Sequence, residues 1–224
     1  MVMTEPGLAG IVFAVREGRV AFQRLLTYTL NMVVKKCEIV LFLAVGLLLT
    51  GHAVITPALM VLLFITNDFL SMSLTTDRAT PSPSPSVWRM PDITAAAVVI
   101  GVCKLGFSTA MLTMGAFRLR LGAAELQTLA LVTLVFGNQA LLYVLRERQH
   151  MWSSWPSSWV LASSALDIAL VSLFALSGVM MEPLNVHVLA ANLLAAAGFA
   201  LILDWIKGPV LRAFKVGKRS TPRD

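Results

Sequence analysis

The sequence predicts an all-α fold: a polytopic membrane protein with six transmembrane helices and with its N- and C-termini both cytoplasmic. The first observation behind this prediction is composition, because 57% of the 224 residues are hydrophobic, only 13% are charged and mean hydropathy is +0.78. The second is a succession of six apolar stretches of spanning length. The third is an uneven distribution of basic residues around those stretches, which is typical of membrane proteins.

The apolar stretches account for most of the chain, so little is left for a water-soluble domain. We place them at residues 39–50 (after a long amphipathic lead-in), 53–74, 93–117, 126–145, 159–181 and 188–206. A 22-residue helix such as 53–74 is about 33 Å long, enough to cross a hydrocarbon core of about 30 Å. We therefore expect a multi-pass integral protein of the cell membrane, in contact with the lipid bilayer.

The first helix is predicted to begin well before its apolar part. Leu8, Ile11 and Val15 recur at helical spacing while Arg16 and Arg19 occupy other faces, so this segment is amphipathic. Few helix breakers occur between residues 20 and 49, which predicts one long helix that starts in the cytoplasm and ends at the outer surface. A tight turn is expected after it, at residues 51–52.

A proline-rich segment divides the chain into two unequal parts. Proline recurs at every second position in TPSPSPS, residues 80–86, which prevents a helix and predicts an extended linker. The predicted organisation is as follows: 1–79, the amphipathic lead-in helix and the first two spans; 80–92, the Pro/Ser-rich cytoplasmic linker; 93–207, a four-span supporting bundle; 208–224, a basic cytoplasmic tail.

The basic residues indicate orientation and not nucleic-acid binding. The net charge is +6, but Lys and Arg gather at the ends of spans and do not form a stripe on a soluble face. With a cytoplasmic N-terminus, 15 of the 18 basic residues lie on the cytoplasmic side. Arg118 and Arg120 lie outside and Lys104 lies within a span, an asymmetry that favours six spans with both ends inside.

Asp68 is the most informative residue, because it is the only charged residue in the stretch 53–74. An aspartate near the middle of a bilayer is unfavourable by about 2.5–3.5 kcal/mol, so such residues face protein or water and often handle an ion or a proton. Asn67 precedes it and adds a polar group at the same level. These two residues are the candidate ion-binding site.

Three other charged residues are candidates for the ion path or for a counter-ion: Glu38, Lys104 and Asp167. Glu38 lies near Lys35 at a spacing that also suits a pair on the helix surface. Lys104 is close to the middle of the third span and needs a partner, for which the candidates are Asp167, Glu38 and Asp68. The sequence does not choose among them. The two cysteines and three histidines suggest neither a disulfide framework nor a metal site.

Several stretches resemble one known family. They are TEPGL (4–8), FQRLLTYTLN (22–31), TNDF (66–69) with TDR (76–78), LQTLA (126–130) and YVLRER (143–148). Together they resemble the P-type ATPases of the plasma-membrane proton pump branch, from the junction after the phosphorylation domain onward. The resemblance implies that the Asp of the Asn67-Asp68 step carries the transported cation, which in that branch is a proton.

The resemblance covers only part of such a pump. The motifs DKTGT, TGES and GDGxND, which belong to the family's ATP-hydrolysing domains, do not occur in the chain. The resemblance therefore implies the C-terminal transmembrane domain, spans five to ten of ten. ATP and Mg²⁺ would bind the missing domains, so we expect no cofactor and no ATPase activity in this chain alone. A separate chain carrying those domains and the first four spans is the expected partner.

Two other interpretations stay open at this level. One is a free-standing six-helix secondary carrier or channel, which would need a complete pathway within these spans. The other is an inactive remnant of an interrupted pump gene. The sequence also leaves open whether the cation is a proton, magnesium or another ion.

Overall fold

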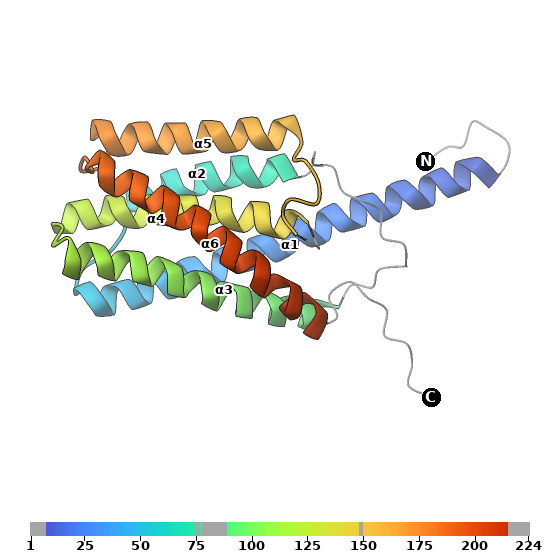
Figure 1. The fold of residues 1–224 in the computed structure, drawn as a ribbon, viewed down its shortest axis with the longest axis horizontal. Coiled ribbons are helices and arrows are strands. Elements are labelled where there is room, and N and C mark those ends of the chain that lie inside the picture. Colours follow the sequence, from blue (N-terminus) through green and yellow to red (C-terminus); the bar gives the residue numbers. More distant parts are fainter. Residues whose placement is uncertain (1–7, 75–76, 78–88, 148–149, 215–224) are drawn as a thin grey trace.

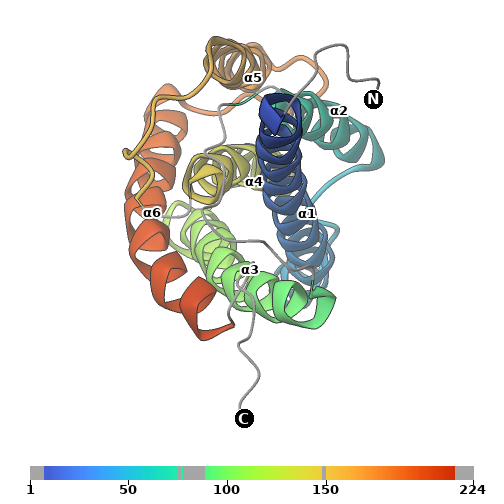
Figure 2. The same ribbon diagram turned by 90° about the vertical axis from the view of Figure 1, so that its right-hand side faces the viewer.

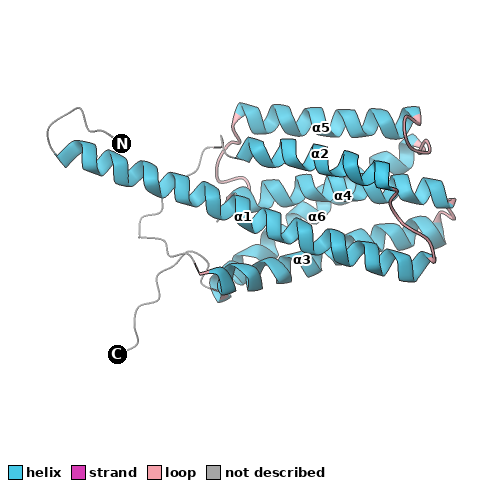
Figure 3. Cartoon of the chain, turned by 180° about the vertical axis from the view of Figure 1, so that it is seen from behind, coloured by secondary structure: helices cyan, strands magenta, loops and turns pink. Residues whose placement is uncertain are grey.

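The computed structural model describes residues 8–74, 77, 89–147 and 150–214, and within these ranges it is helical, without strands (Figure 3). The elements are α1 (Leu8–Thr50), α2 (Pro57–Ser73), α3 (Met90–Thr113) continued by the short π-helix η2 (Met114–Arg118), α4 (Ala123–Arg146), α5 (Ser158–Ser177) and α6 (Val186–Ala213). The predicted all-α polytopic fold is confirmed. The predicted linker core at 80–86, the TEPG start at 4–7 and the tail beyond 214 lie outside the described ranges.

Among the described residues, four helices are long and apolar enough to cross a membrane: α3 with η2, α4, α5 and α6. Helix α2 is apolar but shorter, with 17 residues. Helix α1 has 43 residues and confirms the expected single long helix. Its N-terminal part projects beyond the bundle, and the two ends of the described chain lie at the same end of the bundle (Figure 1).

Local signals explain where the helices begin and end. Thr56 caps α2, where its Oγ1 accepts the Leu59 N–H, and Pro57 follows at the first helical position. Gly51 and Gly178 end α1 and α5 with φ of +73° each, a conformation that favours glycine. Several boundaries differ from prediction. Helix α2 begins at Pro57 and not at residue 53, and α5 ends at Ser177 and not at residue 181. Helix α3 begins at Met90, inside the range assigned to the linker, and α6 continues through Pro209 to Ala213.

Helix α4 forms the centre of the bundle. It contacts each of the other five α-helices, and all of its residues from Leu126 to Leu145 except Gln127 and Tyr143 are buried. Viewed along the bundle, α1, α2, α3, α5 and α6 surround it (Figure 2). Because α4 is buried on all sides, a polar side chain on any of its faces lies in the protein interior. Two such residues, Asn138 and Gln139, are adjacent in its sequence.

Candidate functional site

A buried ion pair joins α1 to α3 in the bundle interior. The Lys104 ammonium contacts Glu38 Oε2, and both side chains are fully buried. Ser108 Oγ, one turn further along α3, donates to Glu38 Oε1 at 2.7 Å. The structure therefore selects Glu38, and not Asp68 or Asp167, as the partner of Lys104. Because neither charge reaches water, each depends on the other for compensation.

Asn138 extends this ion pair to the predicted ion site. Its Oδ1 accepts a hydrogen bond from Lys104 Nζ, while its Nδ2 donates to Asn67 Oδ1 at 2.6 Å. Asn67 is buried on the face of α2 that packs on α4. One chain of contacts thus links Glu38 of α1, Lys104 of α3, Asn138 of α4 and Asn67 of α2, and we call these four residues the central network.

A second lysine of α1 lies beside the central network. Lys35 is 2% exposed and its ammonium donates to Ser71 Oγ at 3.1 Å. Ser71 Oγ in turn donates to the backbone carbonyl of Asn67 at 2.7 Å. Lys35 also interacts electrostatically with Lys104, Asp167, Glu38 and Asp68. Since Lys35 and Glu38 are three residues apart, a single face of α1 presents both charges to the interior.

Asp68 lies on the opposite side of α2 from the central network. The buried face of α2 includes Asn67, Leu70 and Ser71, whereas Asp68 is exposed. Its neighbours on the exposed face are apolar: Val61, Ile65, Phe69 and Met72. The ring of Phe64, one turn before Asp68, lies 4.6 Å from the ammonium of Lys36, which is also exposed. The outer face of α1 and α2 therefore carries opposite charges within an apolar surface.

Asp167 of α5 belongs to a different cluster. Its Oδ2 accepts from Gln139 Nε2 at 2.5 Å, and Gln139 Oε1 accepts from Ser164 Oγ at 2.7 Å. The structure thus brings Asn67, Glu38 and Lys104 together and leaves Asp68 and Asp167 outside that group. Asn138, Gln139 and Ser108 were not singled out from the sequence. The signal that points to Asn138 and Gln139 is an adjacent pair of amides in the middle of the apolar stretch 126–145.

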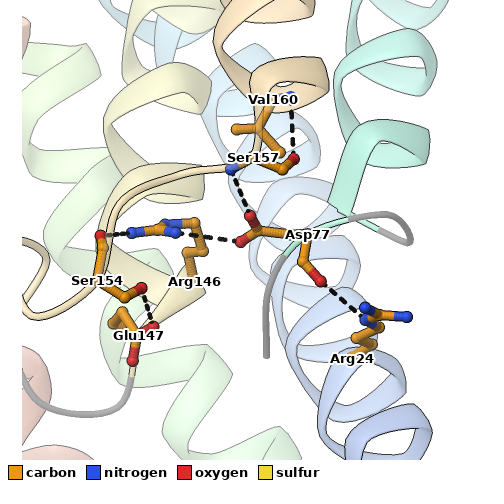
Figure 4. Close-up of polar contacts among 7 residues, drawn as sticks. All are labelled: Arg24, Asp77, Arg146, Glu147, Ser154, Ser157 and Val160. Atoms are coloured by element: carbon orange, nitrogen blue, oxygen red, sulfur yellow. Dashed lines mark hydrogen bonds and ion pairs between the residues drawn. The ribbon is translucent and has the colours of Figure 1, made fainter. Parts of the chain in front are cut away.

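A further polar cluster holds the helix ends together at the end of the bundle from which α1 projects (Figure 4). Asp77 follows α2 and is 4% exposed. Its Oδ1 accepts the Ser157 N–H at the start of α5 at 2.9 Å, and its Oδ2 pairs with Arg146 Nη1 of α4 at 3.4 Å. Its backbone carbonyl accepts from Arg24 Nε of α1 at 2.9 Å. One residue therefore connects α1, α4 and α5 to the end of α2.

Comparison with known proteins shows a similarity that extends along nearly the whole chain. The chain is 28% identical, over 217 residues and 96% of its length, to a protein of Methanocaldococcus jannaschii provisionally named a cation-transporting ATPase. The match covers 27% of that protein, so the chain spans about a quarter of the length of this relative. No protein-family model matches the chain.

Proposed function

We propose that this chain is the C-terminal transport half of a P-type cation-transporting ATPase, located in the cell membrane, with Asn67 and Asp68 in its ion-binding site. The similarity to a named cation-transporting ATPase over 96% of the chain supports the transport role. The all-helical bundle with at least four membrane-spanning helices is consistent with it. ATP and Mg²⁺ would bind the phosphorylation and nucleotide domains of the complete pump, whose motifs this sequence lacks.

The exposed position of Asp68 is the observation that carries the proposal. A carboxylate facing lipid is unfavourable by about 2.5–3.5 kcal/mol, so a face with both Asp68 and Lys36 calls for protein or water beside it. The first four spans of a complete pump would supply that cover. Asp68 would then lie between two groups of helices, where an ion can enter and leave as they move. Those spans can belong to the same polypeptide or to a separate partner chain.

Helix α1 is suited to couple the soluble domains to this site. It extends beyond the bundle at one end and carries Lys35 and Glu38 in the interior at the other. The central network joins Glu38 to Asn67, the neighbour of Asp68. A displacement of α1 would therefore act on the ion site through directly bonded side chains.

The charges around the site favour a proton over Ca²⁺. Glu38 is already compensated by Lys104, and the ammonium of Lys36 lies 4.6 Å from the ring of Phe64, one turn before Asp68. Ca²⁺ takes six to eight oxygen ligands, usually including several carboxylates. One carboxylate with ammonium groups nearby is poorly suited to that task, whereas a single carboxylate is sufficient to carry a proton. We therefore propose a proton as the transported cation.

The test is ATP-driven transport by the complete pump reconstituted in vesicles, with a pH-sensitive dye as readout. Asp68→Asn should abolish proton transport and leave assembly intact, because the amide keeps the shape but cannot exchange a proton. Asp92→Asn is the matched control, since Asp92 lies in the first turn of α3 and pairs with Arg89 at 3.8 Å. It should pump normally.

Two results would contradict the proposal. If Asp68→Asn transports protons at the normal rate, the ion site lies elsewhere. If the purified chain transports ions in liposomes without ATP, it is a free-standing carrier or channel. Translating the DNA upstream of Met1 is a quick complementary test, because an upstream coding sequence with DKTGT and GDGxND would identify the rest of the proposed pump.

A further inference from the structure

Helix α5 buries a single stripe against the rest of the bundle, and that stripe has a polar centre. Its buried residues are Val160, Ser164, Asp167, Val171 and Ala175, spaced three or four residues apart. Asp167 thus lies in the helix interface, where only 8% of the residue is exposed. Buried Val160 and Val171 lie on either side of it along the helix. A carboxyl group in this position requires compensation from its neighbours.

The neighbours of Asp167 compensate only one of its two oxygens. Oδ2 accepts the hydrogen bond from Gln139 Nε2, and Gln139 is held in turn by Ser164. Oδ1 is buried and has no hydrogen-bond partner in the part of the chain that the structure describes. Glu38 differs in this respect, because both of its oxygens accept hydrogen bonds and one of them contacts an ammonium group.

The charged surroundings of Asp167 are sparse. Helix α4 presents neutral Gln139, and the buried polar residues of α2 are neutral as well: Thr66, Asn67 and Ser71. On α6, the buried Asn192 donates to Thr133, and Asp204 and Lys207 pair with each other. Lys35 of α1 acts on Asp167 electrostatically, but its hydrogen bond goes to Ser71. No described residue forms an ion pair with Asp167.

The cluster also borders open space. Gln139 lines a cavity of about 400 Å³ between α4, α5 and α6, whose other walls are largely apolar, including Phe136, Leu193 and Ala196. Water that enters this cavity would reach the Gln139 side chain from the side of α6. This approach is separate from the outer face of α1 and α2, where Asp68 lies.

We propose that Asp167 is a second proton-binding site, in which Oδ1 takes a proton from water while Oδ2 stays bonded to Gln139. One O–H bond forms on Oδ1, and one O–H bond breaks in the hydronium ion that supplies the proton and leaves as a water molecule. An ionised carboxylate with one bare buried oxygen is far less favourable than a neutral carboxyl group in the same place. The site goes beyond the transport role proposed for Asp68 and does not depend on which cation the pump carries.

Infrared spectroscopy of the full chain in lipid nanodiscs tests this directly, because a protonated carboxyl group has a C=O stretching band distinct from that of a carboxylate. At neutral pH we expect such a band, present in the Asp68→Asn variant and lost in Asp167→Asn. Gln139→Met should shift the band to higher frequency, since the C=O at Oδ2 loses its amide donor. Gln127→Met is the matched control, because Gln127 is bonded to the Ala53 carbonyl, and it should leave the band in place.

Two outcomes would overturn the inference. One is a spectrum that Asp167→Asn leaves unchanged from mildly acidic to mildly alkaline pH. The other is a protonated-carboxyl band that Gln139→Met fails to move, which remains decisive if Asp167→Asn does not fold. The measurement uses neither ATP nor transport, so its failure is distinguishable from a failure of the proposed pump function.

Discussion

Lys104 can occupy the middle of the bundle because two oxygens from different helices contact its ammonium group. Glu38 compensates its charge, and Asn138 passes the contact on to Asn67. Removing one member of a buried ion pair leaves the other charge uncompensated, which is more damaging than removing both. At the scale of single residues, the central network is thus a set of side chains that depend on one another.

Lys104→Met should therefore lower the free energy of unfolding by about 3–5 kcal/mol. The double variant Lys104→Met with Glu38→Gln should recover much of that loss, because no buried charge remains. Lys36→Met is the control: Lys36 is exposed and contacts the Phe64 ring at 4.6 Å, so it should change stability by about 1 kcal/mol or less. Unfolding in mixed detergent micelles measures all three. Additive effects of the two substitutions would contradict the coupling of Lys104 to Glu38.

At the scale of the elements, Asp77 fixes how the ends of α2, α4 and α5 meet beside α1. Its side chain caps the start of α5 and pairs with Arg146 of α4, while its backbone carbonyl is bonded to Arg24 of α1 (Figure 4). The side-chain and backbone contacts can be separated by mutation. A substitution at position 77 removes the contacts to α4 and α5 and leaves the contact to α1 available.

Asp77→Ala should destabilise the bundle by about 2–4 kcal/mol, because it removes a helix cap and leaves the charge of Arg146 without its partner. Asp77→Asn should be less damaging, since its Oδ1 can still accept the Ser157 N–H. Hydrogen exchange at the Ser157 amide should accelerate in the alanine variant and much less in the asparagine variant. Equal protection of that amide in both would show that the side chain of Asp77 does not cap α5.

The positions of the helices in the sequence were largely predictable, whereas the face that each helix turns toward the bundle interior was not. Long apolar runs and the breaker at Gly51 were sufficient to locate the helices, although α2 begins at Pro57 and not at residue 53. Helices α3 and α5 are apolar on nearly every face, however, so their patterns do not indicate which face turns inward. For that reason the partner of Lys104 stayed undecided among three acids. The outward position of Asp68 on α2, beside the inward Asn67, was not foreseen either. Both depend on packing between helices.

At the scale of the whole molecule, α1 is a long helix of which only the C-terminal part is packed in the bundle. Of its residues whose burial is described, none before Leu26 is buried. The 18 residues from Leu8 to Leu25 span about 27 Å along the helix axis. In the proposed pump this part would lie between the soluble domains and the bundle, so its stiffness would determine how far a movement is transmitted.

Ala21→Pro should uncouple the complete pump without unfolding the bundle. Ala21 is exposed in the projecting part of α1, and proline there breaks the helix at a local cost of about 3 kcal/mol. We expect ATP hydrolysis to continue while proton uptake per ATP falls severalfold. Ala21→Ser, which keeps the helix continuous, is the control. Unchanged coupling in the proline variant would show that α1 does not transmit the movement.

The central position of α4 has a consequence for how the protein is made. A ribosome delivers α1, α2 and α3 to the membrane before the helix around which they pack. Until α4 arrives, Lys104 lacks the Asn138 oxygen and Asn67 lacks its donor, so the early helices are an incomplete bundle with polar groups facing lipid. Biogenesis should therefore pause at a three-helix intermediate that needs the insertion machinery or a chaperone to shelter it. A nascent chain truncated after α3 should be degraded rapidly.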